Sequence, residues 1–448
     1  MVSILGALRQ VKDDLPRLLT DHVVACVKEQ TDFKWRDRLL DPATTLLLFV
    51  LQVLHQNTAI THLPHLSGLH FSAAAYCQAR VRLPLSLLQN LCSRVASSLV
   101  ESAGAACRWR DHRVWHIDGS SFSMPDTDGL RDHFGLAPRQ QQGCGFPVAT
   151  LMMLCDAAGF VVKTLALPLR THDASQVRAM QGAMAPGDVL VGDRAYCSYA
   201  HLALLLTRNL HGVFRMHQRQ IISFRPGRRC ARQCPKHQRR GRPTSQWVQC
   251  LGRHDQLVRW FKPGQRPDWM NQEDYAALPP SLLLRELRYP VRHKGFRSKV
   301  ITLVTTLADS NTYPAAELAE QYLGRWQIEL NFRHLKTTMK METLKCKTIE
   351  GVKKELAAYV IVYNLVRIVM LQAAARQGVP LSRVSFVDAL RWLQTTRGAG
   401  PLIDLVIHPA RPGRVEPRVI KRRQKPYKLM NRPRPELKQN LKGQRLAA

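Results

Sequence analysis

Four residues whose side chains suit phosphate and metal chemistry stand at a characteristic spacing in the last third of the chain. Tyr322, Arg325, Glu329 and Lys336 follow the pattern Y-x(2)-R-x(3)-E-x(6)-K. At ~100° per residue they fall within a ~60° arc of one helix face. A glutamate between cations suits a metal ligand whose neighbours grip phosphates. The alternative is an exposed ladder in which Arg325 pairs with Glu329 at i, i+4, which stabilises a helix only weakly.

Two aspartates follow apolar segments that read as strands. Asp118 ends the first strand, and Asp193 directly follows Val189–Val191. Ligands collect at strand ends in open α/β sheets, and two carboxylates at the same rim can hold a divalent metal. The alternative for each aspartate alone is a turn or a helix cap.

The elements that would position these residues follow from periodicity and turn signals. Residues 1–105 read as helical, with apolar residues at helical spacing in 46–51 and 83–100. From residue 114 the pattern changes to three strands with a hairpin turn at 156–159, followed by alternating helices and strands. The predicted strands are 114–117, 147–155, 160–168, 189–191 and 213–216, and the predicted helices between them are 174–184 and 198–209.

An arginine-rich stretch then interrupts the α/β pattern. Pro226, Pro235 and Pro243 exclude long helices there, and strand-like segments at 284–289 and 300–306 end it. We therefore expect an insertion at 218–299. Helices are predicted from Pro314 through Met339 and again over 352–376.

The charge indicates a polyanionic partner. The 448 residues carry a formal net charge of +33, with a pI of about 10.4, which excludes an ordinary neutral metabolic enzyme. Residues 213–262 contain 13 Lys or Arg and one Asp, and residues 409–448 contain 13 Lys or Arg and two Glu. Trp247, Trp260 and Phe261 are interleaved with the first basic run, which favours contact with phosphates and stacking of bases. The alternative for each run is a solvated face or tail.

Membrane and export signals are not predicted. The longest uncharged apolar helix, roughly Pro42–Leu54, is shorter than the ~20 residues that a bilayer crossing needs. The N-terminus has no basic region before an apolar one, so we expect a cytoplasmic protein with no membrane partner. The 11 cysteines are typical of reduced intracellular usage. Zinc-type ligands occur at irregular spacing, which favours unpaired cysteines in a basic loop over a zinc site; they are Cys230, Cys234, His237, Cys250 and His254.

The motif and its context resemble those of bacterial transposases of the insertion-sequence-four group, which are DDE enzymes with a ribonuclease-H-like core. The Y-R-E-K pattern is the signature of that family. Residues 118–127, followed by Phe134-Gly135, look like its first-aspartate segment, and 192–196 and 323–336 are similar to its second and third. The likeness runs from about Arg80 to Arg367. A long basic insertion before the third carboxylate also fits the family, although this one is unusually rich in Arg and Cys.

The resemblance implies a fold and a function. The fold class is α/β: a ribonuclease-H-like mixed-sheet catalytic core interrupted by a β-rich basic insertion, with an N-terminal helical domain and C-terminal helices. The function is cut-and-paste transposition of an insertion sequence by hydrolysis and strand transfer at terminal inverted repeats. Two Mg²⁺ ions ~3.5–4 Å apart, for which Mn²⁺ could substitute, would assist the attacking and leaving oxygens. Double-stranded DNA and a synaptic homodimer are the implied partners.

The resemblance also implies residue roles. Asp118, Asp193 and Glu329 would be the catalytic metal ligands, with Asp118 bridging both ions. The implied DNA contacts are those of Tyr322, Arg325, Trp326, Lys336 and Arg194. Arg80 and Arg82, in the helical N-terminus, are expected to take part in recognition of the element's ends. If a hairpin intermediate forms, a flipped base would need an aromatic platform; the candidates are Trp247, Trp260 and Trp269.

The expected domain order has six segments. They are the helical DNA-binding domain 1–105, the first core part 106–217, the insertion 218–299, the second core part 300–348 with the Y-R-E-K helix, the helical region 349–408 with possible dimer surfaces, and the basic, disordered tail 409–448. Two alternative functions stay open. One is a non-catalytic nucleic-acid-binding protein, and the other is another ribonuclease-H-like nuclease such as a resolvase.

Overall fold

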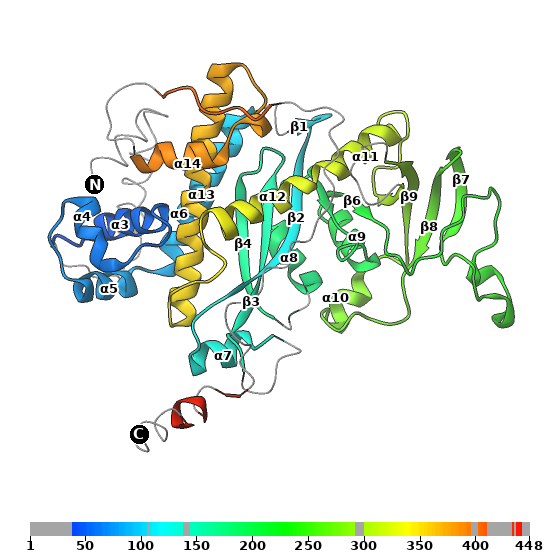
Figure 1. The fold of residues 1–448 in the computed structure, drawn as a ribbon. Helices are drawn as coiled ribbons and strands as arrows, with labels where there is room; N and C mark the ends of the chain where they lie inside the picture. The colour runs from blue at the N-terminus through cyan, green and yellow to red at the C-terminus, as the bar shows by residue number, and fades with distance from the viewer. Residues whose placement is uncertain are drawn as a thin grey trace.

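A large mixed β-sheet forms the centre of the molecule (Figure 1). The computed structural model describes residues 38–104, 108–137, 144–169, 171, 173–291, 300–395, 402–409, 432–433 and 436–440. The strands lie in the order β4-β3-β2-β5-β6-β10-β9-β8-β7, and β1 pairs with β2 off this path. Their bounds are β1 (Arg108–Trp109), β2 (His112–Ser123), β3 (Val148–Asp156), β4 (Val161–Pro168), β5 (Val189–Gly192), β6 (His211–Arg215), β7 (Gln246–Gly252), β8 (Asp255–Phe261), β9 (Ser281–Pro290) and β10 (Val300–Thr305).

The predicted α/β core is confirmed. Strands β2, β3 and β4 form an antiparallel meander, and the predicted turn closes with a hydrogen bond from Gly159 N to Asp156 O at 2.9 Å. Strand β5 then pairs parallel to β2, and β6 parallel to β5. The helices α8 (Val177–Gln181) and α9 (Tyr199–Leu206) lie in the crossover connections. This is the ribonuclease-H-like order that the resemblance implies.

The basic insertion extends the core sheet. Strand β10 pairs antiparallel with both β6 and β9, and β9, β8 and β7 continue the sheet outward. Figure 1 shows these outer strands at the end of the sheet opposite the N-terminal helices. The insertion also contains α10 (Gln272–Ala277) and two short 3₁₀ turns. The strands at 284–289 and 300–306 are confirmed, while the predicted domain boundaries stay predictions.

The remaining helices begin at recognisable caps. Asp41 accepts a hydrogen bond from Thr44 N at 2.6 Å with Pro42 in the first turn, and Thr348 accepts one from Gly351 N at 3.1 Å. The helix that begins at Thr348 ends at Gly378, whose φ of 61° suits a left-handed cap. The bounds are α3 (Pro42–Leu54), α4 (Leu63–Ser67), α5 (Ala73–Arg82), α6 (Leu85–Ala103), α7 (Asp128–Phe134), α11 (Ala315–Gly324), α12 (Trp326–Arg333), α13 (Ile349–Gln377) and α14 (Phe386–Thr395).

Alternation along β2 shows that both faces of the sheet are covered. Trp115 and Ile117 point into the core cluster that contains residues of α8 and α9. Val114 points to the opposite face, into the cluster that contains residues of α11. Asp118 has the same parity as Val114 and therefore faces the side of α11 and α12. This places the first aspartate under the Y-R-E-K segment.

Helix α13 is, among the described helices, the one that is long and apolar enough to cross a membrane by length and composition, with 29 residues. However, 89% of its most apolar window is buried inside the protein, as in the core helix of a globular fold. Its apolar residues share one core cluster with residues of α3, α6 and α14. Most of α13 is therefore buried within the chain, and a dimer surface in the helical region 349–408 stays a prediction.

The N-terminal helices are joined to α13 by buried polar contacts as well as by that core. Glu355 of α13 accepts a hydrogen bond from Asn57 Nδ2 at 2.5 Å and another from Cys346 N at 2.8 Å. Residues 1–37 of the predicted N-terminal domain, and most of the predicted disordered tail at 409–448, lie outside the described residues.

Candidate active site beside β2 and β5

The two predicted aspartates lie at matching positions on neighbouring parallel strands. His116 of β2 is paired with Val191 of β5, and Asp118 and Asp193 each lie two residues further on. Because side chains alternate along a strand, both aspartates have the same parity as that pair. Each side chain is half-buried. The expectation that Asp118 ends its strand is wrong, because β2 continues to Ser123 and stays paired with β3 there, whereas Asp193 does directly follow β5.

Local hydrogen bonds orient the two carboxylates. Asp118 Oδ1 accepts a hydrogen bond from Gly119 N at 2.8 Å, and Asp193 Oδ1 accepts one from Ala195 N at 2.7 Å. The next residue in the second loop, Arg194, is exposed and donates to Gln218 Oε1 at 2.6 Å. In each case the backbone holds one oxygen and so fixes how the carboxylate is turned.

The Y-R-E-K segment is not the single uninterrupted helix that was expected. Helix α11 ends at Gly324, α12 begins at Trp326, and a π-helical turn occupies His334–Thr338. The ring of His334 stacks on Phe386 of α14 at 4.1 Å between centroids and 6° between planes, which fixes the start of that turn. π-turns are rare and frequently occur at functional sites.

Arg325 joins the first and third candidate carboxylates. Its Nη1 donates to Asp118 Oδ2 at 2.8 Å, and its Nη2 donates to Glu329 Oε1 at 2.9 Å. The Arg325 side chain is 14% exposed, so this is a partly desolvated bridge and more than an exposed ladder. The i, i+4 pair between Arg325 and Glu329 that was considered as an alternative is present. Arg325 also binds Asp118, which lies 207 positions away in the sequence.

The remaining residues of the Y-R-E-K motif, Lys336 and Tyr322, lie along the same side of β2. Lys336, in the π-turn, donates to Ser120 Oγ at 3.2 Å. Tyr322 is buried, and the Arg325 guanidinium carbon lies 5.9 Å from its ring centroid. Trp326 is 44% exposed, which leaves its ring accessible to a partner.

Electrostatics at this site centre on Asp118. Burial raises the pKa of Asp118 to about 6, although Arg325 and the Gly119 N–H act in the opposite direction. Asp193 and Glu329 add to the increase, so the two other carboxylates are close enough to repel the charge of Asp118. Burial also raises the pKa of Tyr322, and the charges of Arg325 and Arg215 oppose that shift. A cation added here would relieve this repulsion.

The donor types fit a hard divalent cation, but the side chains do not form a closed cage. Within the described ranges, no group of three His, Cys, Asp or Glu side chains is arranged to hold a metal ion. The guanidinium of Arg325 lies between two of the three carboxylates. The same search gives no zinc cluster in the insertion, where Cys230 and Cys234 are buried free cysteines.

Arg80 and Arg82, which were predicted to take part in recognition of the element's ends, make contacts within the protein. Arg80 donates to Gln52 Oε1 and Cys346 Sγ, both at 3.0 Å, and its guanidinium carbon lies 3.9 Å from the Phe49 ring centroid. These contacts give Arg80 a packing role, and its DNA contact stays a prediction. Arg82 is exposed and donates to Gln78 O at 3.3 Å.

The three candidate tryptophans of the insertion are not equivalent. Trp260 donates to the buried Glu286 Oε1 at 2.9 Å, and Trp269 stacks on His201 with 5.0 Å between centroids. The indole Nε1 of Trp247 is buried with no hydrogen-bond partner in the structure. None of these contacts identifies one ring as a base platform.

Two residues of the site were missed from the sequence. Ser120 is two residues beyond Asp118, so strand alternation places it on the same face, and this signal could have identified it. Gln218 could not be found that way, because it follows β6 and its contact with Arg194 depends on the packing of two loops.

Comparisons with known proteins identify the family of the chain. The family described as transposase DDE domain matches residues 109–365, which include Asp118, Asp193 and Glu329. The chain is 27% identical over 386 residues to the transposase InsG for insertion sequence element IS4 of Escherichia coli (strain K12), covering 81% of this chain and 78% of that protein. A solved structure of the piggyBac transposase synaptic complex with hairpin DNA aligns with 88% of this chain and 80% of its own, at 11% identity and a TM-score of 0.40. The chain belongs to the transposase DDE-domain family.

Proposed function

We propose that this transposase moves an insertion sequence by cut-and-paste transposition, with divalent-cation-dependent cleavage at terminal inverted repeats and transfer of the 3′ ends to target DNA. Asp118, Asp193 and Glu329 are the proposed catalytic residues. The observation that carries the proposal is the bridge from Arg325 to Asp118 and Glu329, at 2.8 and 2.9 Å. It brings together carboxylates that are 211 positions apart.

The three carboxylates would hold two Mg²⁺ ions, or Mn²⁺ in their place. When bound, such ions assist the attacking oxygen and stabilise the leaving oxygen of an in-line displacement. Hard carboxylate oxygens are the ligands that Mg²⁺ prefers. The charges of both Asp193 and Glu329 act on Asp118. Its partial burial strengthens every charge interaction that it makes.

The cationic residues around the carboxylates would position the DNA. Arg325 and Lys336 lie on the same side of β2 as Asp118 and can donate charge-assisted hydrogen bonds to phosphates. The exposed Arg194 lies beside Asp193 and would contact the substrate backbone, and the exposed Trp326 would contact the DNA end. Holding the scissile phosphate in line with the attacking oxygen is the main work of the protein in such a reaction.

The proposal extends to partners and location. The net charge of +33 favours a nucleic-acid partner, and double-stranded DNA is the proposed one. Cutting two ends of an element implies a synaptic homodimer. A cytoplasmic location, with association to the nucleoid when bound, follows from that substrate.

The substitution Glu329→Gln tests the proposal. It keeps the size of the side chain and the hydrogen bond to Arg325 but removes the negative charge that a cation needs. We expect terminal-repeat binding to stay within about twofold, since phosphate contacts set it, while strand cleavage falls by roughly 10³-fold or more. Gel-shift and cleavage assays on one labelled terminal-repeat duplex measure both quantities.

The matched control is Glu320→Gln, an exposed glutamate on α11 of the same segment. It should leave binding and cleavage unchanged. Unchanged cleavage in Glu329→Gln would contradict the enzyme proposal and leave a DNA-binding protein. Equal cleavage of a four-way junction without terminal repeats would instead identify a junction nuclease.

A further inference from the structure

Strand β4 lies at one end of the sheet, opposite the end formed by the insertion. It pairs with β3 on one side, and no strand of the described residues pairs with its other side. At the start of β4, Asn364 of α13 takes the place of a neighbouring strand: it accepts from Val161 N at 3.0 Å and donates to Val161 O at 2.8 Å. Among the described side chains, none does the same for residues 162–166. A free edge of this kind is a template for another extended chain.

A hollow of about 610 Å³ runs along this free edge, and it is here called the β4 groove. Five consecutive residues of β4, 162–166, line it, and all five are half-buried. Residues of α6 and α13 form one wall, and Gly182 and Ala183, which directly follow α8, form the other. A strand added opposite five residues would be ~17 Å long at ~3.3 Å per residue. The groove therefore has the shape that a short extended peptide needs.

The lining of the β4 groove combines apolar surface with positive charge. Leu85 and Leu356 contribute apolar side chains from α6 and α13. The charged members are Lys163 of β4 and Lys353 of α13, and no Asp or Glu is among the described residues that line the hollow. Lys163 Nζ lies 3.8 Å from the position that a Cβ on Gly182 would take, so the ammonium group stands at the wall of the groove. A ligand that matches this lining is partly apolar and negatively charged.

These charges restrict what can occupy the edge. The tail of this chain, residues 409–448, contains 13 Lys or Arg and two Glu, so its charge opposes binding beside Lys163 and Lys353. Pairing of β4 with β4 of a second copy would bring the same lysines of both copies to one edge. A lysine on an edge strand disfavours pairing with neutral or basic strands in general. The occupant must therefore supply carboxylates as well as a peptide backbone.

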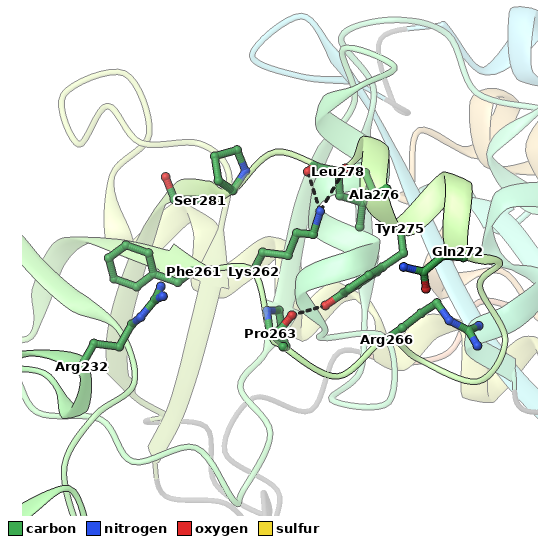
Figure 2. Close-up of a pocket in the computed structure, with 12 residues that line it drawn as sticks. Arg232, Phe261, Lys262, Pro263, Arg266, Gln272, Tyr275, Ala276, Leu278 and Ser281 are labelled. Carbon is green, nitrogen blue, oxygen red and sulfur yellow. Dashed lines mark hydrogen bonds between the residues drawn. The ribbon is translucent and has the colours of Figure 1, made fainter. Parts of the chain in front are cut away.

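A second cationic hollow, on the insertion, has no such edge. It has a volume of about 700 Å³, and Arg232 lines it. Figure 2 shows the ammonium group of Lys262 there turned toward the carbonyls of Ala276 and Leu278, to which it donates at 3.0 and 3.1 Å. The strand that ends at this hollow, β8, is paired on both sides, by β7 and β9. Positive charge without a free edge makes this hollow a control for attraction by charge alone.

The β4 groove is in line with the candidate active site but separated from it by β3. Met153 of β3 is paired with Asp118 on one side and with Thr164 on the other. A strand added to β4 would lie three strand spacings, ~14 Å, from β2. It would thus extend the sheet that carries Asp118 and leave the candidate carboxylates uncovered.

We propose that the β4 groove binds an extended acidic peptide segment of a partner protein, which adds a strand to the free edge of β4. Main-chain hydrogen bonds along β4 give the affinity, and the side chains of the groove give the specificity. Lys163 and Lys353 select a segment that carries carboxylates beside apolar residues. The proposal does not rest on the proposed function, because it uses no residue of the candidate active site.

Fluorescence anisotropy with a labelled peptide of about eight residues that alternates valine and glutamate tests the proposal. The titration uses the full chain at physiological ionic strength. A second peptide has the same side chains with methylated backbone nitrogens, and a third has lysine in place of glutamate. We expect each of these two peptides to bind at least about tenfold more weakly than the first, since one lacks the backbone donors and the other has the wrong charge.

Two variants of the protein locate the binding in the groove. Ser93 of α6 lines the hollow and is exposed, so Ser93→Trp fills the groove without altering the core. Lys353→Glu reverses one of the two charges. We expect each variant to weaken binding of the first peptide about tenfold. Thermal melting checks that both are folded, and Lys353→Glu decides the outcome if the bulky ring destabilises the protein.

The matched controls are Asn90→Trp, an exposed position of α6 outside the hollow, and Arg232→Glu in the insertion. Both should bind the first peptide as the unaltered protein does. Equal binding of the methylated peptide, unchanged binding in Lys353→Glu, or an equal loss in Arg232→Glu would show attraction by charge alone and overturn the proposal. So would displacement of the peptide by a DNA duplex, or no binding by the unaltered protein because its own chain or a second copy occupies the edge.

Discussion

At the scale of single residues, Arg325 is the centre of the candidate site. It supplies the only positive charge that the described residues place between Asp118 and Glu329. A divalent cation needs the same carboxylate oxygens, so the guanidinium and the cation compete for them. A DNA phosphate that draws Arg325 away would therefore favour cation binding.

This competition predicts the effect of Arg325→Gln. Without the guanidinium, the carboxylates lose their internal partner, and we expect Mn²⁺ affinity in the absence of DNA to rise by about tenfold. Strand cleavage should fall, since a phosphate contact is lost as well. Mn²⁺ titration followed by electron paramagnetic resonance measures the affinity.

Lys336→Gln is the control, because the Lys336 ammonium donates its hydrogen bond to Ser120 Oγ and does not bridge those two carboxylates as Arg325 does. Its Mn²⁺ affinity should match that of the unaltered protein. A lower Mn²⁺ affinity in Arg325→Gln would show that the arginine supports the cation site and does not compete with it.

At the scale of elements, the β3–β4 hairpin is locked onto α13. The Tyr363 hydroxyl donates to Gly159 O at 3.0 Å, and Asn364 bonds both the N–H and the carbonyl of Val161, at 3.0 and 2.8 Å. Arg367 donates to Ala158 O and is buried. This docking fixes β3, which pairs with β2 opposite Asp118.

Gly159→Ala should therefore destabilise the whole core. Gly159 has a φ of +83°, and an added Cβ would lie 2.8 Å from Arg367 Nη2. We expect a loss of about 2–4 kcal/mol in the free energy of unfolding, measured by urea denaturation. Gly187→Ala separates the causes, because its φ is +90° with no atom within 4 Å of the new Cβ. Equal losses in both variants would mean that the contact with Arg367 contributes nothing.

His334, which couples the π-turn to α14, predicts a pH dependence of stability. Burial, together with the charges of Arg367, Arg333 and His408, lowers the pKa of His334 to about 3. The folded protein keeps the ring neutral while the unfolded chain protonates it near pH 6.5. Stability should therefore fall as the pH drops below about 6.5 toward 3.

Urea denaturation at pH 7.5 and pH 5 measures this dependence. His334→Phe keeps a ring on Phe386 and should reduce the loss between the two pH values by on the order of 1 kcal/mol. A residual slope is expected, because burial also lowers the pKa of His116, to about 4. An identical slope in the variant would mean that His334 is protonated in the folded protein.

These elements also show which features could be predicted from the sequence and which could not. The strands and the meeting of Asp118 with Asp193 follow from local rules, because alternation and strand ends are encoded within a few residues. The π-turn was not predictable, since it depends on a ring stack between His334 and Phe386, 52 positions apart. The contact of Arg80 with Cys346 is hidden for the same reason.

Helix α13 shows a different limit of composition. Charged residues such as Lys354 and Arg367 lie within the helix that was predicted over 352–376. The structure buries both, with Lys354 Nζ donating to Val81 O at 2.8 Å and Arg367 donating to Ala158 O. Buried charges with backbone partners cannot be recognised from composition alone.

At the scale of the whole molecule, one continuous sheet connects the candidate active site to the basic insertion. Strand β10 pairs with β6 of the core and with β9 of the insertion, so the described strands of both parts belong to one hydrogen-bonded sheet. Arg285 of β9 strengthens this junction: it is 1% exposed, and its Nε donates to Asp255 at 2.8 Å while its Nη1 donates to Tyr313 O at 2.6 Å. Tyr313 directly precedes Pro314, the N-cap of α11, so the insertion is tied to the Y-R-E-K segment.

The central claim is that three carboxylates from separate parts of the chain act as one unit, and a cleavage assay of substituted proteins tests it most directly. The variants are Asp118→Asn, Asp193→Asn, Glu329→Gln and the triple combination, each compared on one terminal-repeat duplex with added Mg²⁺. If the acids act together, each single change should remove nearly as much cleavage as the triple change, roughly 10⁴-fold, with DNA binding retained. A single variant that cleaves near the unaltered rate, or losses that multiply across the three sites, would contradict the account.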